Sequence, residues 1–322
     1  MRMKTVVWLI VAASLLLLGG LLFTGAMVAI HWDFEELSTV KYETNHYTPD
    51  QSYENILIVT NTADVTLVMT EEDRTEVVCY EESKIRHTVW VEEDTLHIEV
   101  EDTRKWYEHI GVSFGNTSIT IFLPKDGSYK SLVVKEDTGD VSVAKELGFE
   151  SIDISTDTGD VECYASVKKN MKIATDTGDI RVEDLRVDAL ELTVSTGKIT
   201  ASRVDCRYDT SIHVSTGDAF LTDLTCYRLT STGSTGHLTL KNVIARETFS
   251  ITRSTGDVRF EACDADTIYV KTNTGDVTGS LLTEKSFFPY TSTGDVDLPR
   301  TTVGGRCEIT TSTGDIKITI NK

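Results

Sequence analysis

A Thr-Gly dipeptide recurs at a nearly constant interval through the C-terminal part of this 322-residue chain. Ten such dipeptides occur, successive glycines are 19 or 20 residues apart, and Asp follows the glycine in eight of the ten units. The repeat glycines are Gly139, Gly159, Gly178, Gly197, Gly217, Gly236, Gly256, Gly275, Gly294 and Gly314. A fixed period of this length indicates stacked structural repeats, each of which is one small supersecondary unit.

Apolar and polar residues alternate after each repeat glycine. The positions two and four residues after the glycine are apolar with one exception, and the position between them is polar in nine of the ten units. In one unit these positions hold Ile180, Arg181 and Val182. Such alternation is typical of a half-buried β-strand. A second alternating segment precedes each glycine, as in Leu190 and Leu192. Each unit is therefore predicted to be a strand, a Thr-Gly-Asp corner, a second strand and a return.

Two short strands cannot bury an apolar face alone, whereas stacked identical units form a continuous core. The sequence therefore predicts an all-β fold in which residues 131–322 form a parallel β-solenoid, with a right-handed coil as the expected hand. Ten rungs at about 4.8 Å would extend roughly 48 Å. A propeller needs about 40 residues per blade, and a leucine-rich array needs a Leu-x-x-Leu-x-Leu skeleton. Neither pattern is present.

Residues 33–130 have similar alternating runs but lack the Thr-Gly signature. Residues 61–65 resemble a repeat corner in which Ala63 replaces the glycine, 76 residues before Gly139 and thus close to four periods away. Repeat arrays need atypical terminal units that stop end-to-end association through exposed strand edges. We predict that this region forms irregular β coils and a cap at the end of the solenoid.

Residues 1–32 predict a short cytoplasmic stub and one transmembrane helix. A run of 26 residues from Thr5 to Ile30 carries no charge. As a helix it would measure roughly 39 Å, enough to cross a hydrocarbon core of about 30 Å. Arg2 and Lys4 favour a cytoplasmic N-terminus, which places the bulk of a single-pass protein outside the cytoplasm. Small residues near the end of the run leave signal-peptide cleavage as an open alternative.

The charge balance restricts the partners. The chain has 51 Asp and Glu residues against 31 Lys and Arg residues, for a formal charge of −20. Such an acidic chain is repelled by phosphate backbones, which excludes nucleic acid as a partner. The membrane, envelope glycans and other envelope proteins are the partners that the predicted topology favours.

The order of these features resembles a bacterial family of membrane-anchored, adhesin-like proteins whose domain has no established function. The resemblance rests on the N-terminal apolar segment, the Ile-Phe-Leu-Pro run that ends at Pro124, and the serial Thr-Gly-Asp-Val corners, and it covers residues 53–320. It implies a surface-exposed solenoid with an adhesive or envelope-associated role. It implies no catalytic residues and no cofactor.

The Asp residues that follow the repeat glycines are predicted to stack in a row along one edge of the solenoid. Corner Asp residues commonly accept hydrogen bonds from turn amides, which is the structural interpretation. A row of carboxylates about 5 Å apart also offers the oxygen ligands that Ca²⁺ prefers. On that second hypothesis Asp257, Asp276 and Asp295 are the candidate ligands, although the Gly-Gly-x-Gly-x-Asp pattern of calcium-binding β-rolls is absent.

Two of the six cysteines occupy equivalent positions in successive units. Cys206 and Cys226 both follow their repeat glycine by nine residues, so they are expected to be stacked neighbours and form the candidate disulfide. Cys163, Cys263 and Cys307 fall at apolar positions and are predicted to be buried hydrophobes.

The pattern of the chain disfavours catalysis, since the acids recur equivalently while an active site needs one differentiated cluster. The sequence contains no phosphate loop and no Gly-x-Ser-x-Gly elbow. The leading hypothesis is a non-enzymatic envelope protein that presents an adhesive or envelope-binding surface. The alternatives are a scaffold or regulatory partner of other membrane proteins in envelope stress, and a glycan-acting β-helix enzyme. An unusual Phe287-Phe288-Pro289-Tyr290 run near the far end is a candidate bulge or partner surface.

Overall fold

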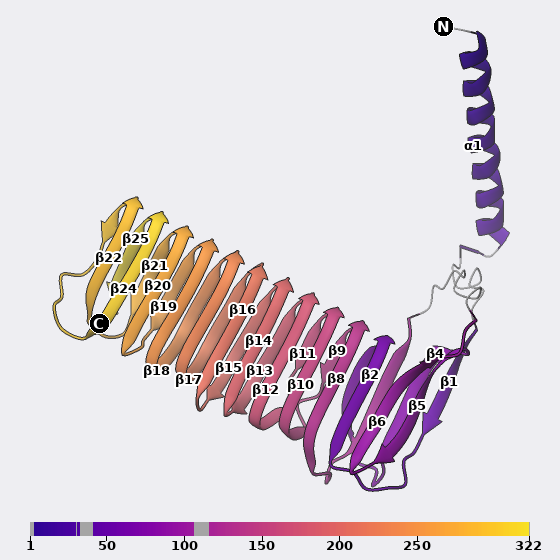
Figure 1. Cartoon of the computed structure of the whole chain (residues 1–322), viewed down its shortest axis with the longest axis horizontal. Coiled ribbons are helices and arrows are strands. Elements are labelled where there is room, and N and C mark those ends of the chain that lie inside the picture. Colours follow the sequence, from indigo (N-terminus) through magenta and orange to yellow (C-terminus); the bar gives the residue numbers. More distant parts are fainter. Residues whose placement is uncertain (1–2, 30, 33–40, 106–115, 322) are drawn as a thin grey trace.

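The N-terminal helix stands apart from the β-structure in the computed structural model, which describes residues 3–29, 31–32, 41–105 and 116–321. Helix α1 spans Met3–Ala29, and its segment from Ile10 to Ala29 has a mean hydropathy of 2.2 with almost none of its surface buried (Figure 1). A helix of this length and composition can cross a membrane.

The regular part of the β-structure consists of rungs, each made of one strand before a Thr-Gly corner and one strand after it (Figure 1). Rungs separated by one period pair in parallel, so Val161 lies beside Ile180, and Ile180 beside Ile199. These strands are β8 (Tyr129–Thr138), β9 (Val141–Val143), β10 (Gly148–Thr158), β11 (Val161–Cys163), β12 (Ser166–Thr177), β13 (Ile180–Val187), β14 (Ala189–Thr196), β15 (Ile199–Cys206), β16 (Asp209–Thr216), β17 (Ala219–Thr235), β18 (Leu238–Thr255), β19 (Val258–Cys263), β20 (Thr267–Thr274) and β21 (Val277–Leu281). The predicted parallel β-solenoid with its 19- to 20-residue period is confirmed.

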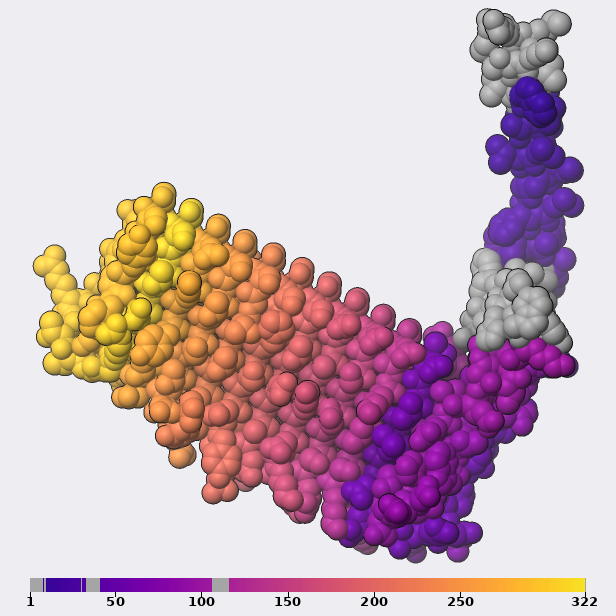
Figure 2. Space-filling model, viewed as in Figure 1, coloured from indigo at the N-terminus to yellow at the C-terminus, as the bar shows by residue number. Residues whose placement is uncertain are grey.

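The apolar columns of the repeat form one continuous core. Cys163, Val182 and Ala201 follow one another on neighbouring rungs, and each is fully buried. The side chain of Arg181, between two inward positions, is 54% exposed. The predicted register is therefore confirmed. In the space-filling view the outward side chains form regular ridges along the solenoid (Figure 2).

The C-terminal end does not follow the order of the sequence. It contains β22 (Lys285–Thr293), β23 (Val296–Asp297), β24 (Gly305–Thr313) and β25 (Ile316–Ile320). The last rung, β24–β25, pairs with β20–β21 on one side and with β22–β23 on the other. The rung that comes last in the chain is thus inserted before the rung that precedes it. Consequently β22–β23 is the terminal rung, and Val296, at a position that is buried in other units, is 47% exposed.

The inserted rung enters through a Gly304-Gly305 pair. A Cβ on Gly304 would collide with the carbonyl oxygen of Glu284, and one on Gly305 with the carbonyl oxygen of Asp266. Glu284 precedes β22 and Asp266 precedes β20, so the two glycines fit between the rungs that the last rung separates. Only residues without a side chain allow the backbone to approach both neighbours this closely.

The N-terminal end is closed by a similar exchange of order and by antiparallel strands. Its strands are β1 (Tyr42–Tyr47), β2 (Asn55–Thr62), β3 (Asp64–Thr70), β4 (Glu76–Glu82), β5 (Ile85–Glu92), β6 (Thr95–Asp102) and β7 (Ser118–Pro124). The rung β2–β3 pairs with β8–β9 on one side and with β6 and β7 on the other. Ile56 lies beside Leu132, which fits the predicted distance of four periods from the Ala63 corner. Strands β4, β5 and β1 then add antiparallel layers at this end.

Candidate functional site

The repeat glycines shape one edge of the solenoid. All ten have a positive φ, between +126° and +153°. A Cβ on Gly159 would collide with the carbonyl oxygen of Gly139 in the rung below, and the same contact recurs along the row. Glycine is therefore needed at these corners both for backbone conformation and for the close approach of neighbouring rungs.

The corner Asp residues bond to one another's rungs. Oδ1 of Asp140 accepts a hydrogen bond from the amide of Asp160 at 2.8 Å, and Oδ1 of Asp160 accepts one from the amide of Asp179 at 2.7 Å. Each carboxylate thereby holds the next corner, while the contact leaves its second oxygen free for other partners. The row is thus a repeated side-chain to backbone ladder between rungs.

The calcium candidates are not three consecutive members of this row. Oδ1 of Asp257 accepts from the amide of Asp276 at 2.9 Å, and Oδ1 of Asp276 accepts from the amide of Asp315 at 2.8 Å. Asp295 comes after Asp315, because the last rung is inserted between theirs. The expectation that all three would stack directly was wrong in this respect. Calcium binding by these carboxylates stays a prediction.

A basic groove crosses the other edge of the central rungs. It has a volume of about 640 Å³, and its cationic lining is Lys168, Arg186, Arg207 and Arg246. Buried Val167, Val187 and the two cysteines discussed below form its apolar floor. Its acidic lining is Asp188 and Asp205. Arg207 lies 3.9 Å from Asp188, whereas no ion pair within the described ranges involves the other three cations.

Cys206 and Cys226 lie side by side in the floor of the basic groove. Asp205 pairs with Thr225, so the two cysteines follow on neighbouring strands, and both side chains are 3% exposed. Both are free thiols in the structure. Burial, and the nearby thiol of Cys206, raise the pKa of Cys226 to about 12. A disulfide between them stays a prediction.

One inward position holds two buried charged residues that the sequence pattern did not single out. Three residues before the corner, most rungs carry Thr or Val, but Glu136 and Arg253 occupy two of them. Arg253 is 1% exposed and fits over Gly233, where a Cβ would collide with its guanidinium. That guanidinium donates to the carbonyl oxygen of Thr232 at 3.1 Å and to Oγ of Ser231 at 3.0 Å. Burial lowers the pKa of Arg253 to about 10.

Glu136 is a destabilising residue at neutral pH. It is 4% exposed, and neither carboxyl oxygen has a hydrogen-bond partner among the described residues. Burial raises its pKa from 4.5 to about 8. Between these values the unfolded chain is ionised at this site while the folded chain keeps the proton. Stability is therefore lost as pH rises from about 4.5 to about 8.

We expect Glu136→Gln to stabilise the protein by roughly 2 to 4 kcal/mol at pH 8 and by little at pH 4.5. Chemical unfolding of both proteins across this range measures the difference. Glu146→Gln, which changes an exposed acid on the same coil, is the control and should show no such slope. A difference between wild type and Glu136→Gln that is constant with pH would contradict the assignment.

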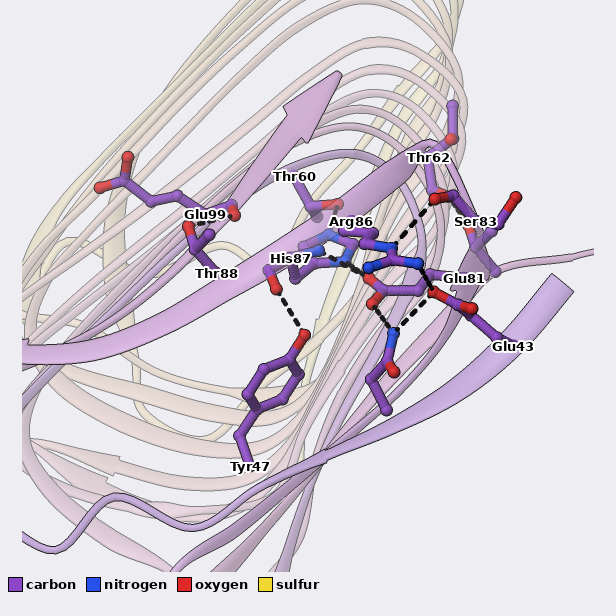
Figure 3. Close-up of polar contacts among 12 residues, drawn as sticks. Glu43, Tyr47, Thr60, Thr62, Glu81, Ser83, Arg86, His87, Thr88 and Glu99 are labelled. Carbon is purple, nitrogen blue, oxygen red and sulfur yellow. Dashed lines mark hydrogen bonds and ion pairs between the residues drawn. The ribbon is translucent and has the colours of Figure 1, made fainter. Parts of the chain in front are cut away.

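A buried polar cluster lies within the antiparallel layers at the N-terminal end (Figure 3). Nδ1 of His87 is 2.6 Å from Oε2 of Glu81, and its Nε2 is 2.9 Å from Oγ1 of Thr60. Asn45 donates to Oε1 of Glu81 at 2.7 Å. Glu81, His87 and Thr60 are 1%, 4% and 2% exposed. The sequence analysis did not identify this cluster, because its residues come from three strands and form no motif.

Cys79 completes the cluster. It lies two residues before Glu81 on β4, so both side chains point inward. The ligand atoms of Cys79, Glu81 and His87 all lie within 4.8 Å of one another. Burial and the charge of Glu81 raise the pKa of Cys79 to about 12. Burial acts to raise the pKa of Glu81, but hydrogen bonds from His87 and Asn45 outweigh it and hold this pKa below its usual value.

Comparisons with known proteins place the fold. The sequence matches the family described as Toastrack DUF4097 over residues 53–218 and 205–322. It matches no curated protein. One similar solved structure, a "putative lipid binding protein" from Parabacteroides distasonis ATCC 8503, is 16% identical, with 75% of this chain and 95% of that chain covered and a TM-score of 0.51. A "putative adhesin" from the same organism is 13% identical, with 76% and 98% covered and a TM-score of 0.52.

At these identities the two solved structures support the solenoid fold alone. The sequence match is more specific, since its two segments together cover the chain from residue 53 to its last residue. It includes the serial Thr-Gly corners, the terminal rungs and most of the antiparallel layers. This chain belongs to the Toastrack DUF4097 family.

Proposed function

We propose that this protein is a non-enzymatic, single-pass envelope protein whose solenoid binds an anionic polymer of the cell envelope along the basic groove. The basic groove is the observation that carries the proposal. On a chain with a formal charge of −20, four cations gather around an apolar floor, and three of them lack an ion pair among the residues described. Unneutralised cations in a concave site attract an extended anion.

The dimensions suit a linear ligand. The groove is lined from Ser166 on β12 to Arg246 on β18 and so crosses several rungs. Because rungs are spaced by about 4.8 Å, cations on successive rungs meet a chain that carries charges at short intervals. The printed descriptions of the similar structures, one adhesive and one lipid-binding, agree with attachment to surface material. Arg2 and Lys4 favour an orientation with the solenoid outside the cytoplasm.

A charge-reversal experiment tests the proposal. The full-length chain in detergent is titrated with fluorescent polyphosphate, and binding is followed by anisotropy. We expect binding that weakens with salt, and a loss of at least about tenfold when Lys168, Arg186 and Arg246 are all changed to Glu. The matched control changes Lys172, Lys271 and Lys317 to Glu, which alters the net charge equally outside the groove. Equal losses in both variants, or no binding by wild type, would overturn the proposal.

A second candidate function, docking on another envelope protein, is favoured by the far end of the solenoid. The terminal strand β22 pairs on one side only, with β24. It exposes Phe288 and Tyr290 by 49% and 61%, and the guanidinium of Arg306 lies 4.3 Å from the ring centre of Phe288. Pro289 interrupts the donors of this edge, so a partner would contact mainly the aromatic side chains. Crosslinking in intact envelopes that recovers proteins through this end would support this candidate.

A further inference from the structure

The cluster of Cys79, Glu81 and His87 has the composition of a transition-metal site. Thiolate, imidazole and carboxylate are the three protein ligands that Zn²⁺ binds. The three side chains come from the adjacent strands β4 and β5, are 0%, 1% and 4% exposed, and place their ligand atoms within 4.8 Å of one another. It is the only such group of His, Cys, Asp and Glu side chains in the described part of the chain.

The second atoms of two ligands are already held. Asn45 binds Oε1 of Glu81, which leaves Oε2 toward His87, and Oγ1 of Thr60 binds Nε2 of His87, which leaves Nδ1 toward Glu81. Metal-binding histidines typically use their other ring nitrogen in this way, because the outer contact fixes the ring orientation and the tautomer. The arrangement therefore directs Oε2 and Nδ1 to one point near Cys79.

The charge of the cluster also favours a divalent cation. Glu81 is buried without a Lys or Arg ion pair among the residues that the structure describes, and its contacts are to Asn45 and His87. An ionised carboxylate in such surroundings needs a compensating charge. A divalent cation bound by a thiolate, a carboxylate and a neutral imidazole has zero net charge.

We propose that Cys79, Glu81 and His87 bind one Zn²⁺ ion, or a similar transition-metal ion, within the N-terminal cap. On binding, the Cys79 S–H bond breaks, its proton passes to water, and a metal–sulfur bond forms. His87 binds through Nδ1 and carries its proton on Nε2, which donates to Thr60. The Nδ1 to Oε2 distance, now 2.6 Å, would open by about 0.7 Å to give tetrahedral ligand spacing.

Access to the cluster is from the outer side of β5. A hollow of about 630 Å³ is lined by Tyr47, Arg86 and His87, among others. Tyr47 donates from its hydroxyl to the carbonyl oxygen of His87 at 2.8 Å and covers the cluster from this side (Figure 3). A water that enters here could serve as the fourth ligand, since three protein ligands and one water are a common zinc arrangement. The ion would tie β4 to β5, and Thr60 on β2 would join it through His87.

Cobalt substitution tests the site. The full-length chain in detergent, reduced and freed of metal with a chelator, is titrated with Co²⁺, and the near-ultraviolet absorption of a cobalt–thiolate bond is recorded. We expect one Co²⁺ per chain, displaced by one Zn²⁺, and a rise in melting temperature with Zn²⁺ because the ion binds only the folded state. Cys79→Ser should abolish the thiolate absorption, and His87→Gln should weaken metal binding at least tenfold.

Two controls separate this site from the other thiols. Cys163→Ser changes another fully buried cysteine, far along the chain, and should keep the full signal. The double variant of Cys206 and Cys226 to Ser removes the other neighbouring thiol pair and should also keep it. No thiolate absorption in wild type would overturn the proposal and leave a hydrogen-bonded network only. Absorption that survives Cys79→Ser, or is lost in the double variant, would overturn it equally.

Discussion

Removal of residues 300–322 is expected to disorder residues 282–299 as well. The deleted segment contains β24–β25, which is an interior rung of the stack even though it ends the chain. Without it, β22–β23 has no neighbour, because both of its strands pair only with the deleted rung. The loss includes the buried side chains of Cys307, Ile309 and Ile316. At about 1.5 to 3 kcal/mol for each large apolar side chain, the cost is several kcal/mol.

Hydrogen exchange of the full-length and truncated chains measures this effect. The amides of β22 should be protected in the full chain and unprotected after truncation. A second truncation that ends at Leu281 is the control, and it should melt at the same temperature as the first, because the same rungs remain folded. Protected β22 amides in the chain that lacks residues 300–322 would mean that this strand repairs with β20, against our expectation.

Val182→Asp is expected to unfold the central rungs, with a loss of more than about 5 kcal/mol. Val182 is fully exposed to the core and closed to water, between Cys163 and Ala201 on the adjacent rungs. The variant would lose the burial of an apolar side chain and place a carboxylate where the core offers no cationic partner. Thermal and chemical unfolding measure the loss.

Arg181→Asp is the matched control for Val182→Asp. It introduces the same side chain one residue away, at a position that points to solvent, and forfeits only a surface contact of Arg181 with Glu183 at 3.2 Å. Exposed ion pairs of this kind contribute about 0 to 1 kcal/mol. Comparable losses in the two variants would contradict the inward and outward register.

Periodicity was sufficient to predict the regular rungs. Residues that recur every 19 or 20 positions with alternating polarity can satisfy their backbone and bury their apolar side only by stacking, so Val182 and its column were placed correctly. The Ala63 corner was also recognised, because a distance of 76 residues is close to a whole number of periods.

Periodicity could not predict the exchanged order at either end. Every rung offers the same apolar columns to both neighbours, so β20–β21 can pair equally well with the next rung or with the one after it. The Gly304-Gly305 pair was the available signal, since two adjacent glycines before a strand indicate a close approach of backbones. The metal cluster gave no local signal, because the pairing of β4 with β5 and β7 brings its residues together.

The interchangeable rungs have a consequence for how such chains can vary over evolutionary time. Duplication or deletion of one 19- or 20-residue unit between β10 and β18 would keep the Gly, Asp and apolar columns continuous, so a longer or shorter solenoid should still fold. Each added unit would extend the molecule by about 4.8 Å. The exchanged rungs at the two ends allow no such change, because each depends on one particular pair of neighbours. Length can therefore drift in the middle of the gene while both ends stay fixed.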